Sequence, residues 1–210
     1  MSVIERRFST GLPFLDRKIG GGLVPGRILA LTAPPTSQGE LLLAELLAAR
    51  RALLVSTTRT EAELDVWLEA HKAADNVRTL STSPEALLET PSRVTDALSP
   101  ESFLVLDPAD DLEAADRDRY LQFLDRVKTT LRETDSIGIL HCIDQERQPE
   151  QRSLTLHRAD YVWQIETLVL SREIKTRLLV TKARRGRALT EPIPLQLTDQ
   201  VRIDTSRRIA

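Results

Sequence analysis

The hydrophobic residues of this chain form short runs separated by longer amphipathic stretches. Buried strands are predicted at residues 28–32, 52–56, 77–80, 103–106 and 136–142, and helices at 38–50, 61–72, 84–98 and 115–133. From residue 161 the hydrophobic period shortens to two, which predicts a strand meander over 161–170, 176–182, 193–197 and 201–204. This pattern is typical of an α/β fold with a mostly parallel sheet flanked by helices, followed here by a C-terminal antiparallel meander.

Composition adds limits to this picture. The 210 residues suit a single domain spanning 1–210, and 41% hydrophobic with 29% charged residues indicates a chain that folds. The net charge of −2 indicates neither a nucleic-acid partner nor a mimic of a polyanion. The lone Cys142 excludes an internal disulfide, and no apolar run resembles a secretory signal or a membrane span. We therefore expect a cytoplasmic protein with no membrane partner.

The loop after the first predicted strand occupies the position of a phosphate-binding P-loop. Such a loop has the pattern G-x-x-x-x-G-K-[ST], in which backbone N–H groups and the lysine hold the phosphates. Here the segment reads APPTSQGE, with Ala33 at the first glycine, Gln38 at the second, Gly39 at the lysine and Glu40 at the hydroxyl. Shifting the alignment by one residue puts Glu40 at the lysine position. Neither alignment supplies a cation.

The same segment fits a helix capping box. Ser37 and Glu40 have the S-x-x-E spacing, so we expect them to satisfy the first N–H groups of the helix at 38–50. Glu40 would also repel a polyphosphate. Alternatively, Glu40 faces solvent and a weak nucleotide site survives.

Several short motifs resemble those of the KaiC-like and RadA-like ATPases of the RecA superfamily. The segments FSTG at 8–11, LD at 15–16 and GGG at 20–22 resemble the opening of that family, which precedes its first strand and P-loop. Further on, Asp107 resembles the Walker B acid, residues 159–160 resemble the AD before a late strand, and 180–184 resemble the VKxR stretch. The resemblance covers nearly the whole chain and implies a RecA/KaiC-like fold.

This chain departs from the family pattern at the positions of the catalytic residues. The glutamate pair that activates water in KaiC-like ATPases aligns with Thr58 and Arg59, and Glu61 is the nearest substitute base. The resemblance implies that Asp107 would bind Mg²⁺ through water, although a structural remnant is the interpretation that we favour. The predicted remnant of a nucleotide site comprises Ala33, Thr36, Ser37, Gly39, Glu40 and Asp107.

No metal site is predicted. An acidic run contains Asp107, Asp110, Asp111 and Glu113, but such clusters usually form solvated loops. The three histidines and the single cysteine have no zinc-binding spacing. His141 lies where the related family often has a polar sensor, and we interpret it and Cys142 as rim and core residues.

The densest basic cluster lies near the C-terminus and contains Lys182, Arg184, Arg185 and Arg187. In the family that this chain resembles, the stretch matching Lys182 and Arg184 contacts the nucleotide of the adjacent subunit. A solvated hairpin turn and a nucleic-acid contact are the alternatives. The loop at 145–158 mixes both charges and has no aromatic residue, so a strong DNA site is not expected.

The sequence thus leads to one principal functional hypothesis and two others. The first is a RecA/KaiC-like pseudo-ATPase, a regulatory or scaffolding domain with no expected cofactor. It would form homo-oligomers or complete the site of an active RecA-like ATPase partner. The second is a weak ATPase that uses ATP and Mg²⁺ in signal transduction or in DNA recombination and repair. The third is a DNA-binding recombination accessory.

Overall fold

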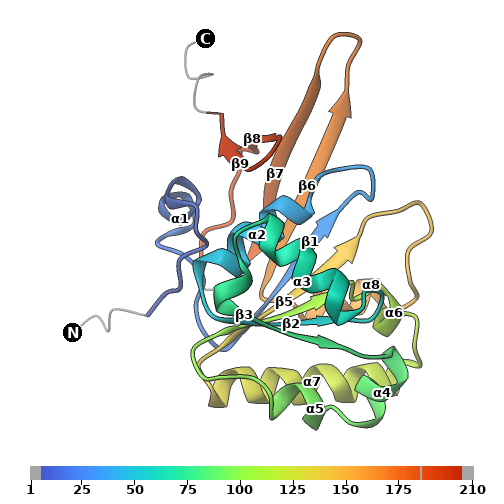
Figure 1. Ribbon diagram of the computed structural model, residues 1–210. Helices are drawn as coiled ribbons and strands as arrows, with labels where there is room; N and C mark the ends of the chain where they lie inside the picture. Colours follow the sequence, from blue (N-terminus) through green and yellow to red (C-terminus); the bar gives the residue numbers. More distant parts are fainter. Residues whose placement is uncertain (1–5, 185, 205–210) are drawn as a thin grey trace.

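Nine strands form one continuous sheet in the computed structural model, which describes residues 6–184 and 186–204 (Figure 1). The strands are β1 (Arg27–Ala33), β2 (Ala52–Ser56), β3 (Val77–Ser81), β4 (Phe103–Asp107), β5 (Ile137–Ile143), β6 (Tyr161–Val169), β7 (Ile174–Ala183), β8 (Ile193–Leu197) and β9 (Val201–Ile203). Their spatial order is β3-β2-β4-β5-β1-β6-β7-β8-β9. The strands from β3 to β6 pair in parallel, and β7, β8 and β9 add antiparallel pairs. The predicted fold class is confirmed.

Helices cover both faces of the sheet. One face packs against α1 (Pro13–Ile19), α2 (Glu40–Ala49) and α3 (Glu61–Ala70), and the short 3₁₀ helix η1 (Ala74–Asn76) follows α3. The other packs against α4 (Pro84–Glu89), α5 (Ser92–Thr95), α6 (Asp110–Glu113), α7 (Arg117–Glu133) and α8 (Arg152–Arg158). Alternate strand residues point to opposite faces, so Leu29 and Leu31 join the first core while Ile28 and Ala30 join the second.

The longest helix, α7, has a regular apolar face that is visible in the sequence. Residues of α7 at helical spacing are buried against the sheet: Tyr120, Phe123, Leu124, Val127 and Leu131. They form one apolar stripe along the helix that the sequence predicts at residues 115–133. The structure adds α1 and α6, for which the sequence predicts no helix, and residues 152–158 of the predicted loop form α8. No helix among the described residues is long and apolar enough to cross a bilayer.

The N-terminal motifs form one hydrogen-bonded turn. The carboxylate of Asp16 accepts hydrogen bonds from Ser9 Oγ at 2.6 Å, Thr10 N at 3.0 Å and Thr10 Oγ1 at 2.8 Å. Gly22 has a φ of +110°, and a Cβ at this position would collide with the carbonyl group of Phe8. The STG, LD and GGG segments therefore have a structural role at the start of the fold.

Candidate functional site

A small open pocket lies at the carboxyl ends of the parallel strands. Its walls come from the loop between β1 and α2, from the turn after β2 and from the ends of β4 and β5, and its volume is about 260 Å³. Ligands of open α/β sheets bind in this region, because loops from several strands converge there. The pocket is therefore the candidate site.

Most of the residues predicted for a nucleotide site line this pocket. Those that do are Ala33, Ser37, Gly39, Glu40 and Asp107. Thr36 is exposed and lies outside the lining, as does Glu61, which is the first residue of α3 and is also exposed. The structure thus brings five of the predicted residues together in the pocket. The candidate base Glu61 lies outside it.

Arg59 links the two acidic residues of the pocket. Its Nη2 atom lies 3.1 Å from Glu40 Oε2 and 3.6 Å from Asp107 Oδ2. The guanidinium also lies 5.3 Å from the ring centroid of Trp67, within cation–π range. From the sequence, Arg59 is only the replacement for a glutamate of the family that this chain resembles. Its position three residues after the end of β2 is the signal that could place a cation in the site.

Asp107 is buried and has both carboxylate oxygens engaged. His141 Nδ1 lies 2.6 Å from Oδ1, while Arg59 lies near Oδ2. Burial alone would raise the pKa of Asp107, but the hydrogen bond from His141 and the electrostatic interactions with His141 and Arg59 hold that pKa below its ordinary value. The carboxylate is thus ionised and is already balanced by groups of its own chain.

The capping box predicted for α2 is wrong. The helix begins at Glu40 with Gly39 as its N-cap, and no side chain caps it. Ser37 Oγ donates to the carbonyl oxygen of Pro34 at 2.7 Å and accepts from Gly39 N at 3.2 Å, so Ser37 stabilises the preceding turn. The Glu40 side chain points instead to Arg59, because a charged partner is available there.

Gly39 and Ala33 are packed too closely for both to carry a Cβ atom. A Cβ added to Gly39 would lie 2.5 Å from that of Ala33 and 3.2 Å from Ile165 Cδ1. The backbone of Gly39 is ordinary right-handed helix, so this requirement for glycine is steric. A larger residue at position 39 therefore needs a smaller one at position 33.

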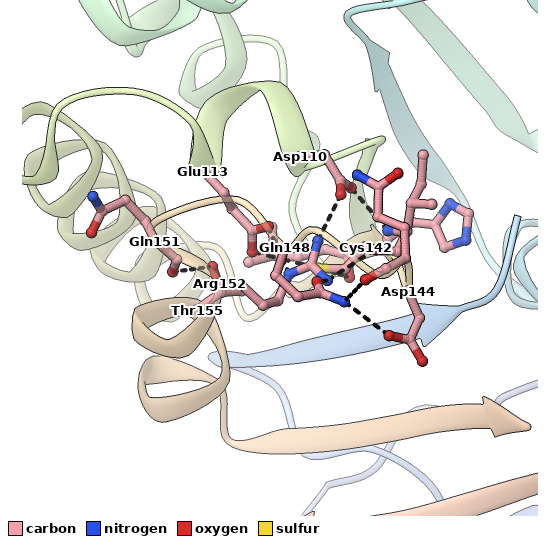
Figure 2. A network of polar contacts seen from close by, with 12 residues as sticks. Asp110, Glu113, Cys142, Asp144, Gln148, Gln151, Arg152 and Thr155 are labelled. Atoms are coloured by element: carbon pink, nitrogen blue, oxygen red, sulfur yellow. Dashed lines mark hydrogen bonds and ion pairs between the residues drawn. The ribbon is translucent and has the colours of Figure 1, made fainter.

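Behind the pocket lies a buried ionic network centred on Arg152 (Figure 2). Arg152 donates to Asp110 Oδ1 from Nη2 and to Glu113 Oε2 from Nε, each at 2.7 Å. It also donates to Gln148 Oε1 at 2.6 Å and to the carbonyl oxygen of Ile143 at 3.0 Å. Asp110 in turn accepts from Ile143 N at 2.9 Å, which fixes the pocket wall at the end of β5.

This network corrects the expectation that the acidic run is a solvated loop. Asp107, Asp110 and Glu113 are buried, because cations from distant segments reach them, and Asp111 accepts a hydrogen bond from Thr57 Oγ1 at 2.9 Å. No group of three or more potential metal ligands occurs among the described residues. Burial raises the pKa of Glu113 despite its contacts with Thr155 and Arg152.

Cys142 is fully buried beside this network. Its Sγ atom lies 3.7 Å from Glu113 Oε1, and burial together with the charge of Glu113 raises the thiol pKa well above its ordinary value. A protonated, inaccessible thiol is a packing residue.

Two residues of the predicted basic cluster bind to their own chain. Lys182 Nζ donates to the carbonyl oxygens of Leu156 at 2.7 Å and His157 at 2.9 Å, at the C-terminal end of α8. Arg184 Nη2 donates to His157 O at 3.3 Å, and its Nη1 lies 3.9 Å from buried Asp160. Lys182 therefore holds a helix end, where cations are favoured.

The other two residues of that cluster are placed differently. Arg185 lies outside the described residues. Arg187 is exposed and lines a separate hollow beside α1.

Replacing Lys182 with alanine is expected to lower the free energy of unfolding by about 1–2 kcal/mol, because charge-assisted bonds to a helix end are lost. Lys175→Ala is the matched control on the same strand. Lys175 pairs with Glu173 at 2.7 Å with both side chains more than a third exposed, so its loss should cost less than about 0.5 kcal/mol. Urea unfolding measures both. Equal stability of the two variants would contradict this role.

The strand order, the two helix layers and the pocket at the carboxyl edge define the KaiC-like class of the RecA fold. The fold matches the crystal structure of KaiC-like protein PH0186 from the hyperthermophilic archaeon Pyrococcus horikoshii OT3 with a TM-score of 0.75 at 17% sequence identity, covering 94% of this chain and 98% of that one. At this identity the match establishes the fold alone. Residues 7–210 match the family described as "Family of unknown function (DUF7125)", and the chain belongs to that family. No curated protein matches the sequence.

Proposed function

We propose that this protein is a KaiC-like pseudo-ATPase, a regulatory or scaffolding domain that acts through contacts with copies of itself or with a RecA-like ATPase. The observation that carries the proposal is the position of Arg59, which lies between Glu40 and Asp107 in the pocket. Arg59 is thus already paired with both carboxylates of the site. The site therefore has neither a free cation for phosphate nor a free carboxylate for magnesium among its described lining residues.

The energetics of these contacts support the proposal. A magnesium ion would have to displace the hydrogen bond between His141 and Asp107, and a hydrogen bond to a charged group contributes about 1.5–3 kcal/mol. It would also have to compete with Arg59, whose Nη2 atom lies 3.6 Å from the same carboxylate. A phosphate would also approach the carboxylate of Glu40, which repels it. Residues 33–40 contain no lysine, so no cation of this loop offsets the displacement of His141 and Arg59 or the repulsion by Glu40. Hydrolysis additionally needs a base, and Thr58 and Arg59 stand where the related ATPases have glutamates.

The second candidate function is weak ATP binding, and Arg59 is also the observation that favours it. A guanidinium that moved from Glu40 to a phosphate would supply the missing cation, while Asp107 and His141 stay in the same pocket. This candidate requires ATP and Mg²⁺ to overcome the ion pairs described above.

Phosphate release from Mg·ATP separates the two functions. The wild-type protein and the Asp107→Asn variant are expected to release phosphate at the same rate as a protein-free blank, because no base or metal ligand is available. Asp107→Asn is the control that identifies a contaminating ATPase. Release by the wild type that the folded variant loses would contradict the proposal and support the weak ATPase.

The same assay tests the regulatory half of the proposal. A purified RecA-like ATPase from the same cell is mixed with increasing amounts of this protein, and its turnover is expected to change to a saturating value. Unchanged turnover across all RecA-like ATPases of that cell would leave contacts between copies of this protein as the remaining mode of action.

A further inference from the structure

A two-stranded hairpin projects from the carboxyl edge of the sheet. Strand β6 pairs with β1 only as far as Gln164, and β7 pairs with β8 only over residues 176–178. Beyond these residues, β6 and β7 pair only with each other. The hairpin therefore extends beyond the body of the protein, which is plain in Figure 1. An isolated ribbon of two strands has little stability in water by itself.

The end of this hairpin carries large apolar side chains in water. Four of the five exposed large hydrophobic residues in the described part of the chain lie here: Leu168, Val169, Leu170 and Ile174, with exposures of 41%, 78%, 45% and 70%. We call these four residues the knob. Val169 and Ile174 are opposite one another in the strand register, whereas Leu168 is opposite Lys175 and lies on the other face. Apolar groups thus surround the hairpin end.

The size of the knob limits what can cover it. Four such side chains form a patch of a few hundred Å², the size at which exposed apolar surface marks an interaction site. A contact made through the knob alone buries less than the roughly 1,200 Å² of a stable interface, so we expect an association that depends on protein concentration. Because its apolar groups point to both faces, the knob fits a concave surface better than a flat one.

A hollow beside α1 offers such a surface. It lies between α1 and the segment before β8, and its volume is about 590 Å³. Phe14, Leu189 and Pro192 supply apolar walls. The rim carries both charges, with cations at Arg17, Lys18 and Arg187 and carboxylates at Glu191 and Asp204.

The turn of the hairpin also carries both charges, in Arg172 and Glu173. The knob and the hollow therefore have the same kind of surface: apolar groups next to charged groups of both signs. In Figure 1 the hairpin points away from α1, so one chain does not fill its own hollow with its own knob.

We propose that the knob of one copy inserts into the hollow beside α1 of a second copy. The contact is heterologous, since it joins two different surfaces, and it can continue from copy to copy. It rests on the proposed function in naming the surfaces of the proposed contact between copies, but it would stand even if the pocket bound ATP.

Two variants and their mixture test this contact. Val169→Asp/Ile174→Asp removes the knob, and Ala188→Glu/Thr190→Glu obstructs the hollow at two exposed lining positions. Both variants gain negative charge, so net charge does not draw them together. Light scattering across a concentration series is expected to give a wild-type mass that rises above 23.6 kDa, while each variant remains at 23.6 kDa.

The equimolar mixture is the decisive sample. Each variant retains the surface that the other lacks, so one productive contact remains and the mixture should contain particles of twice the chain mass. Thermal unfolding of each variant serves as the folding control. A wild type that stays at 23.6 kDa, variants that associate like the wild type, or a mixture without recovery would each overturn the proposal. So would a monomeric wild type that sediments with anionic phospholipid vesicles through the knob.

Discussion

Arg152→Ala is expected to lower the free energy of unfolding by about 3–5 kcal/mol, because it leaves Asp110 and Glu113 buried without their cation. Arg152 also binds the carbonyl oxygen of Ile143 at 3.0 Å, so the loss reaches the wall of the pocket. A change of this size is a large part of the stability of an ordinary domain. The measurement is urea unfolding followed by far-UV circular dichroism.

The matched control is Arg158→Ala on the same helix. Arg158 pairs with Asp125 at 3.2 Å, but the two side chains are 37% and 58% exposed. Exposed pairs contribute about 0.2–1 kcal/mol, so this variant should stay close to the wild type. If the two variants had the same stability, the ionic network around Arg152 would not have the role described here.

A variant that rebuilds the phosphate-binding pattern is expected to bind Mg·ATP at least about a hundredfold more tightly than the wild type. The changes are Ala33→Gly, Gln38→Gly, Gly39→Lys and Glu40→Thr. Adding the lysine contact and removing the like charge should contribute about 1–3 kcal/mol each, which together give this factor. Ala33→Gly is essential, because the Cβ atoms at positions 33 and 39 cannot coexist.

The control for the rebuilt loop keeps Gly39 and carries the other three changes. It loses the carboxylate of Glu40 but gains no lysine, so its affinity should lie between those of the wild type and the full variant. Calorimetric titration measures all three proteins. Equal affinity of the control and the full variant would show that position 39 does not decide phosphate binding.

The fold could be predicted because its signals are local and periodic. The buried runs of β1, β2 and β4, the helical stripe of α7 and the alternation of the C-terminal meander all follow from spacing along the chain. Helix α6 was missed because it has only four residues, which is too short for a periodic signal.

The candidate site could be predicted only in part, because its charges pair across long stretches of sequence. Arg59 is 19 residues from Glu40, and Arg152 is 42 residues from Asp110. No local pattern connects such partners. Local reasoning therefore assigned Glu40 to a capping box and treated Asp110 as solvated, whereas each has a distant arginine.

The projecting hairpin illustrates a different limit. The period of two in the sequence predicted strands at 161–170 and 176–182, which the structure confirms as β6 and β7. Alternation indicates which residues share a face, but it does not tell whether this chain covers that face. Ile165 is buried and Val169 is exposed on one strand, because only the first lies over the body of the protein.

The central claim is that the charged groups of the pocket pair with one another and that the pocket does not hold a nucleotide. Calorimetric titration of Mg·ATP into the wild-type protein tests it most directly. The ion pairs of Arg59 with Glu40 and Asp107 lead us to expect no saturable binding below about 1 mM ATP. Stoichiometric binding with a Kd in the micromolar range would contradict the claim.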